Sequence, residues 1–82
     1  MIITTTELTT AIISSQYGWA VADQFKDTFE GGEPFEEQNM NALKNIYLTI
    51  KDLIKSGLLS KQAVMELESY RYDLSMYLTG IK

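Results

Sequence analysis

Residues 36–57, EEQNMNALKNIYLTIKDLIKSG, have the clearest helical pattern in this chain. Its apolar residues recur at spacings of three and four, and on a helix of 3.6 residues per turn they share one continuous face. This face consists of Met40, Leu43, Ile46, Tyr47, Ile50, Leu53 and Ile54. The other side carries Lys44, Asn45, Thr49, Lys51, Asp52 and Lys55, with Leu48 as its one apolar exception. The pattern predicts an amphipathic helix at the centre of the molecule.

Both ends of this predicted helix carry terminal signals. Glu36 and Glu37 would lie at the helix N-terminus, where the helix dipole favours negative charge. Gly57 suits the left-handed residue after the last turn, and Leu58 can then fold back onto the helix. We therefore expect a helix over about residues 35–56.

A first helix is predicted over about residues 5–30. Thr4 and Glu7 have the spacing of a capping box, although residues 1–6 also have strand propensity. Gly18 lies in mid-helix, where glycine is unfavourable, so a kink or break there stays open. The expected inner face is Leu8, Ala11, Ile12, Ser15, Gly18, Trp19, Ala22, Phe25 and Phe29.

A third helix is predicted over about residues 61–79, because Ser60 is a favourable N-cap and an apolar face follows it. The chain has no repeat and no long linker, so we expect one small domain over residues 1–82. The predicted class is all-α, a three-helix bundle or hairpin.

The small size of the chain predicts self-association. A domain of 82 residues buries only about 60% or a little more of its unfolded surface and is marginally stable alone. With no cysteine, no disulfide can supplement the core, and oligomerisation is a common alternative. We expect a homo-oligomer, most simply a dimer, to complete the bundle.

The composition also excludes several functions. Without histidine and cysteine, the commonest general base, thiol nucleophile and zinc ligands are missing, so we expect no enzyme, metal or cofactor. The net charge of −4 disfavours a nucleic-acid partner. No apolar run approaches the ~20 residues that span a bilayer, and the start lacks the features of a secretory signal. We expect a cytoplasmic protein with no membrane insertion.

The first and third helices each carry a second apolar stripe opposite the inner face. Methionine and tyrosine are enriched at adaptable protein interfaces, which favours a surface for another protein. Packing of each helix between two neighbours is the structural alternative. The stripes are Ile13, Tyr17 and Val21 in the first helix and Met65, Tyr72 and Met76 in the third.

Arg71 lies between two tyrosines, Tyr70 and Tyr72. An arginine in such a setting is typical of an interface hot spot, but it also stacks on tyrosine rings within a fold. We include Arg71 in the predicted interface and leave both interpretations open.

An acidic segment runs from the end of the first helix to the start of the second. Its carboxylates belong to Asp23, Asp27, Glu30, Glu33, Glu36 and Glu37, with Lys26 as the one opposing charge. A basic protein surface or a hard cation would fit this charge, but the segment lacks the ligand pattern of an EF-hand loop. A solvated face is the simpler interpretation.

We expect a small non-enzymatic regulator or inhibitor that binds another protein. In size and style it resembles the accessory proteins that phages and mobile elements encode, which would place it in a host cytoplasm. One alternative is a helix-turn-helix regulator formed by the last two helices, although its recognition helix carries Glu66, Glu68 and Asp73. Another is a binder of a small nucleotide-like ligand in an oligomer groove.

Overall fold

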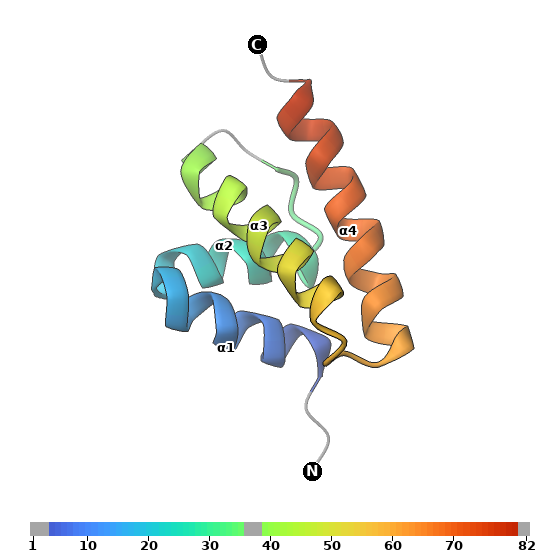
Figure 1. Ribbon diagram of the computed structural model, residues 1–82. Helices are drawn as coiled ribbons and strands as arrows, with labels where there is room; N and C mark the ends of the chain where they lie inside the picture. The colour runs from blue at the N-terminus through green and yellow to red at the C-terminus, as the bar shows by residue number, and fades with distance from the viewer. Residues whose placement is uncertain (1–3, 36–38, 81–82) are drawn as a thin grey trace.

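A computed structural model describes residues 4–35 and 39–80 of the chain (Figure 1). Within these ranges the regular structure is helical, in four helices: α1 Thr5–Tyr17, α2 Trp19–Phe29, α3 Met40–Ser56 and α4 Lys61–Thr79. The all-α class is therefore confirmed, whereas the expected number of three helices is wrong. None of the described helices combines the length and apolar character needed to cross a membrane.

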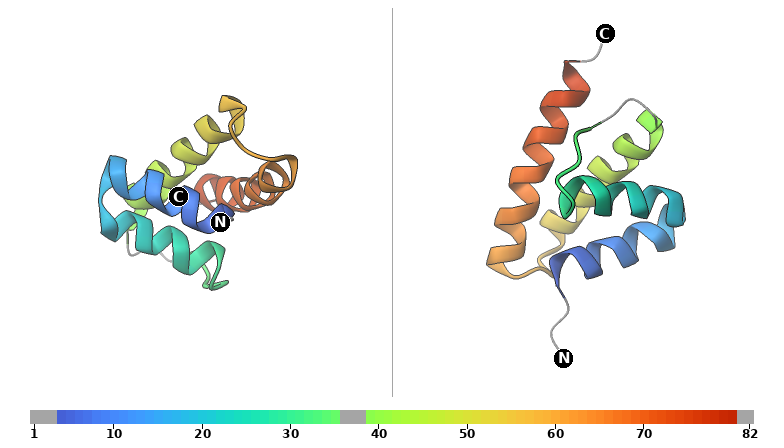
Figure 2. Two further views of the ribbon diagram at one scale, coloured as in Figure 1. Left: turned by 90° about the horizontal axis from the view of Figure 1, so that it is seen from below. Right: turned by 180° about the vertical axis from the view of Figure 1, so that it is seen from behind.

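The first predicted helix is two helices, because the chain breaks at Gly18. This residue has φ 93° and ψ 171°, a conformation that is essentially restricted to glycine. Its N–H still donates to the Ser14 carbonyl at 2.9 Å and closes α1, and its own carbonyl accepts from Ala22 at the start of α2. As a result α2 turns back and packs against α1, and the pair lies across α3 (Figure 2).

The break also changes which side of α1 is buried. The buried residues of α1 are Thr6, Thr9, Thr10 and Ile13. Ala11 and Ser15, which we expected on the inner face, are exposed. Trp19 was expected in the core as well, yet it is 66% exposed. The expectation assumed one straight helix, so the reversal of direction at Gly18 made it wrong.

Helix α3 begins later than expected. The Asn39 side chain accepts a hydrogen bond from the Ala42 N–H at 2.9 Å, and this N-cap starts the helix at Met40. Residues 36–38, including Glu36 and Glu37, lie outside the described residues, so the predicted acidic helix start is not described. Gly57 ends the helix in the left-handed conformation, as expected. Leu58 is 80% exposed and does not fold back, which corrects the predicted cap.

Helix α4 has the predicted limits. The Ser60 hydroxyl accepts from the Ala63 N–H at 3.2 Å, as expected of an N-cap, and the helix runs from Lys61 to Thr79. Together α3 and α4 form a hairpin, and α1 and α2 lie against it (Figures 1 and 2).

The core lies where the four helices meet. Fully buried Leu43, Ile46 and Ile50 from α3 confirm the apolar face that defined the central helix. Thr49, which we placed on the polar side, is 3% exposed, because α1 covers it and its hydroxyl donates to Gln16 Oε1 at 3.2 Å. The other fully buried large apolar residues are Ile13, Phe25, Leu67 and Leu74.

An aromatic cluster fastens α2 and the following segment to α4. The ring of Tyr70 makes edge contacts with Phe25, Phe29 and Phe35, with ring centroids 5.5, 5.2 and 5.6 Å away. The ring centroids of Phe35 and Tyr77 are also 5.5 Å apart. These contacts hold residues 31–35 alongside α4, where Figure 1 shows this segment. Such edge-to-face pairs add about 0.5–1.5 kcal/mol each beyond the area that they bury.

Candidate functional site

The outward side of α4 presents a continuous strip that includes large apolar side chains. We call Met65, Ser69, Tyr72 and Met76 the α4 stripe. Their spacing of four, three and four residues places them on one face of the helix. Met65, Tyr72 and Met76 are 61%, 63% and 58% exposed, and Ser69 is exposed too. The described helices do not cover this face.

The exposure of the α4 stripe follows from the inner face of the same helix. Leu67 and Leu74 are fully buried and Tyr70 is 7% exposed, so these residues fix the helix rotation. The stripe residues then point away from the core. The three apolar residues of the stripe were predicted as interface residues, and binding at this face stays a prediction.

Carboxylates surround the α4 stripe. Glu66, Glu68 and Asp73 are exposed on the same helix, whereas Lys61 in the first turn is the one exposed cation of α4. A partner surface that carries positive charge around an apolar centre would be complementary to this arrangement.

Arg71 belongs to the fold and not to the α4 stripe. Its guanidinium carbon lies 6.0 Å from the centre of the Tyr47 ring on α3, and the side chain is half-buried. This distance is at the outer limit of the range for a cation–π contact. The structure therefore favours the stacking interpretation of Arg71 over the hot-spot interpretation.

The second predicted stripe does not form a surface. Ile13 is fully buried and Val21 is 9% exposed, and both belong to the core cluster. Tyr17 is 40% exposed at the end of α1. The break at Gly18 separates Tyr17 from Val21, so the three residues no longer share one helix face. The burial of Ile13 and Val21 favours the structural alternative, in which this helix packs between its neighbours.

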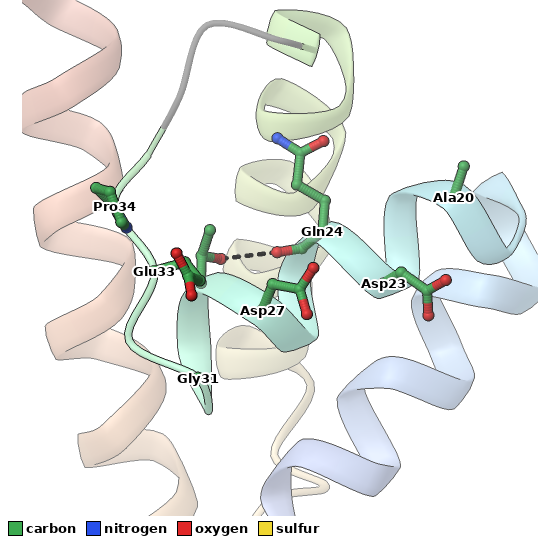
Figure 3. A pocket seen from close by; sticks show the side chains of 8 residues that line it. Ala20, Asp23, Gln24, Asp27, Gly31, Glu33 and Pro34 are labelled. Atoms are coloured by element: carbon green, nitrogen blue, oxygen red, sulfur yellow. Dashed lines mark hydrogen bonds between the residues drawn. The ribbon is translucent and has the colours of Figure 1, made fainter.

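The described residues of the acidic segment line two different hollows. Asp23 and Asp27 project from successive turns of α2, and Glu33 follows in the next segment (Figure 3). These three carboxylates line an open hollow of about 510 Å³ together with Gln24 and Pro34.

Glu30 does not line that hollow. It lines instead a second hollow, to which Glu66 and Asp73 of α4 also contribute. Glu36 and Glu37 of the predicted patch are outside the described residues. Within residues 4–35 and 39–80, no group of three acidic residues is arranged to hold a metal ion. The carboxylates that are described fit the solvated interpretation better than a cation site.

A buried polar contact joins α2 to α4. The hydroxyls of Thr28 and Tyr70 form a hydrogen bond at 2.5 Å, in which either can be the donor, and the Thr28 hydroxyl also lies 3.0 Å from the Gln24 carbonyl oxygen. Burial raises the pKa of Tyr70 to about 12, and the bond from Thr28 opposes this shift. The phenol is therefore neutral at physiological pH, and its hydrogen bond links α4 to α2.

A further exposed strip on α3 was not singled out from the sequence as a site. Lys44, Leu48, Lys51 and Lys55 have the same spacing of four, three and four residues, and all four are exposed. We call them the α3 stripe. Leu48, at 50% exposure, is its apolar centre. The signal was available, because Leu48 was the one apolar residue on the lysine-bearing side of this helix.

Comparison of the chain with protein-family models, with curated proteins and with solved structures found no match.

Proposed function

We propose that this protein is a small non-enzymatic regulator or inhibitor that acts by protein–protein binding through the α4 stripe. The observation that carries the proposal is the high exposure of Met65, Tyr72 and Met76 on one face of one helix. Isolated exposed apolar residues are ordinary, but here three large ones share a single helix face.

The chemistry of the α4 stripe supports this role. Methionine side chains are flexible and polarisable and adapt to the shape of a partner. Tyrosine offers a large rigid ring with a polar tip, which is why it is frequent among interface hot spots. On α4 the tyrosine lies between the two methionines in the sequence, with carboxylates on both sides of the strip.

The two alternative functions receive less support. In a helix-turn-helix, α4 would enter the DNA groove, yet its exposed side carries Glu66, Glu68 and Asp73, which phosphates repel. Of the two basic residues on α4, Arg71 lies over the Tyr47 ring. A nucleotide-like ligand would meet similar repulsion in the hollow lined by Asp23, Asp27 and Glu33.

Photo-cross-linking from the α4 stripe tests the proposal. A benzophenone amino acid in place of Tyr72 keeps an aromatic group at this position and captures whatever protein contacts it in the cell. Trp19 provides the matched control, since it is an aromatic residue of similar exposure, 66% against 63%, on a different helix.

We expect a discrete cross-linked protein from position 72 and none, or a different and weaker set, from position 19. Mass spectrometry identifies the captured protein, which is either a second copy of this chain or another protein. No specific product from position 72 would contradict the proposed function.

A further inference from the structure

The α3 stripe and the α4 stripe have matching dimensions. Each stripe spans eleven residue steps, and at 1.5 Å per residue each is about 16 Å long. Side chains occur at the same four steps in both, so one stripe can be laid along the other residue by residue. Two helix faces of equal length can pack along one another, with the side-chain ridges of one in the grooves of the other.

The two stripes also have opposite charge. Three of the four α3 stripe residues are lysines, and Asp52 is the one acidic residue of α3. The α4 stripe is surrounded by Glu66, Glu68 and Asp73. Lysine side chains can lay their aliphatic stems along apolar surface while the ammonium groups reach out to carboxylates.

The antiparallel alignment pairs the apolar groups of the two stripes. In this direction Leu48 lies opposite Tyr72, and Lys51 lies opposite Ser69 with Glu68 and Asp73 on either side. The remaining lysines, Lys44 and Lys55, then lie along the two methionines. The parallel alignment would place Leu48 against the small polar Ser69 and leave Tyr72 without an apolar partner.

Symmetric pairings of like stripes are electrostatically unfavourable. Two α4 stripes face to face would bring carboxylates opposite carboxylates, and two α3 stripes would bring lysines opposite lysines. Juxtaposed like charges at an interface are costly and exclude wrong partners. Of the three combinations, only α4 against α3 brings opposite charges together around apolar centres.

We propose that the occupant of the α4 stripe is the α3 stripe of a second copy of this chain. The inference rests on the proposed function, because it takes the α4 stripe as a binding face and names its partner. The contact joins different surfaces of two copies, so each copy offers one surface of each kind to its neighbours. Because its polar part consists of surface charges, salt weakens the association.

The test measures the mass of the full-length chain in solution over a concentration series. For the wild type we expect a mass that rises above 9.3 kDa with concentration and that rises less at ~1 M salt. Tyr72→Ala removes the centre of the α4 stripe, and Lys51→Glu reverses charge in the α3 stripe. Each variant alone should associate at least tenfold more weakly, as expected for an interfacial hot spot.

Mixing the two variants gives the decisive observation. Tyr72→Ala retains an intact α3 stripe and Lys51→Glu retains an intact α4 stripe, so the two chains should form a complex together that neither forms alone. Lys26→Glu is the matched control, because it makes the same charge change at an exposed position on α2 outside both stripes. This control should associate as the wild type does.

Several results would overturn the inference. A mass of 9.3 kDa at every concentration would exclude a second copy, while cross-linking at position 72 would still decide the proposed function separately. Association that survives Lys51→Glu but not Tyr72→Ala would indicate pairing of two α4 stripes. Equal weakening by Lys26→Glu would indicate an effect of net charge alone.

A second variant of each stripe guards against loss of folding. Thermal unfolding followed by circular dichroism checks every variant, and Met76→Gln and Lys55→Glu replace any variant that does not fold. Failure of these two variants to complement each other when mixed would also count against the inference.

Discussion

The Tyr70 hydroxyl on α4 and the Thr28 hydroxyl on α2 form a hydrogen bond at 2.5 Å, within the aromatic cluster that joins these two helices. Tyr70 is 7% exposed, and Thr28 is held in place by its own bonds to the carbonyls of Gln24 and Phe25. The bond gives a buried phenol its polar partner, so ionisation of this phenol and unfolding of the protein are coupled.

The raised pKa of Tyr70 predicts that the protein loses stability at alkaline pH. Its pKa is about 12 in the folded chain and 10.0 as the reference for the unfolded chain, so above pH 10 the unfolded chain releases the proton first. The contribution of the buried neutral phenol of Tyr70 to the free energy of unfolding is fully present below pH 10. It declines between pH 10 and pH 12. The decline is roughly 1.4 kcal/mol per pH unit, because one pKa unit corresponds to that free energy.

Tyr70→Phe isolates this contribution. At pH 8 the free energy of unfolding of this variant should be lower by about 0.5–1.5 kcal/mol, because the hydrogen bond to Thr28 is missing. It should then lose less stability than the wild type between pH 10 and pH 12. Urea unfolding at several pH values measures both quantities, and parallel pH profiles for the two proteins would contradict the coupling.

Two threonine hydroxyls in α1 predict a stabilising substitution. Thr9 Oγ1 and Thr10 Oγ1 are buried and have no hydrogen-bond partner within residues 4–35 and 39–80. Thr9 is fully buried, and a buried unpaired polar group costs about 1–3 kcal/mol. Thr9→Val replaces the hydroxyl with a methyl group of similar size, so we expect a gain in unfolding free energy of roughly 1 kcal/mol.

Thr49→Val is the matched control for this prediction. Thr49 is equally buried, but its hydroxyl donates to Gln16 Oε1, so the same change removes a hydrogen bond. We expect no gain, or a loss of up to about 1 kcal/mol. Thermal or urea denaturation of both variants compares them, and stabilisation by both would show that hydrogen bonding is not the cause.

Gly18→Ala tests the break between α1 and α2. An added Cβ would meet no atom within 4 Å, so the substitution introduces no clash. With φ 93° and ψ 171°, however, alanine would pay about 1–3 kcal/mol for the backbone conformation. If the chain were helical through this position, alanine would instead stabilise it by about 1 kcal/mol. The sign of the change in urea denaturation therefore distinguishes a break from a continuous helix.

Ser15→Ala provides the control for Gly18→Ala. This exposed position lies inside α1 and should change stability by no more than about 0.5 kcal/mol. A similar effect of both substitutions would indicate that helix propensity alone accounts for the result.

Leu74 and Tyr72 lie on opposite sides of α4 and should respond differently to truncation. Leu74→Ala removes a fully buried side chain and should cost about 2–5 kcal/mol through lost burial and a cavity. Tyr72→Ala removes a side chain that is 63% exposed and should change the stability of the dissociated chain by no more than about 0.5 kcal/mol.

Protein concentration must be varied when these two variants are compared. In an associating protein, folding and association are linked, so the unfolding midpoint depends on concentration. A concentration-independent loss for Tyr72→Ala as large as that for Leu74→Ala would show that Tyr72 contributes to the core.

The inner faces of α3 and α4 could be predicted from the residue pattern alone. In α3 the apolar residues Leu43, Ile46 and Ile50 occupy one side and lysines the other, so one rotation buries far more apolar area than any other. The Ser60 cap and the periodicity after it fixed the limits of α4. The exposure of Met65, Tyr72 and Met76 follows from the rotation of α4, since Leu67 and Leu74 of the same helix are buried.

The arrangement of the first third of the chain could not be predicted from the residue pattern, because it depends on how α1 and α2 pack together. In α1 the apolar and small polar residues are spread around the whole helix, so several rotations bury similar area and periodicity does not select one. The backbone conformation at Gly18 selects one rotation of α1. This conformation turns α2 back against α1, so that Thr9, Thr10 and Ile13 are buried. Trp19 consequently lies outside and Val21 inside, an outcome that depends on how two helices pack together.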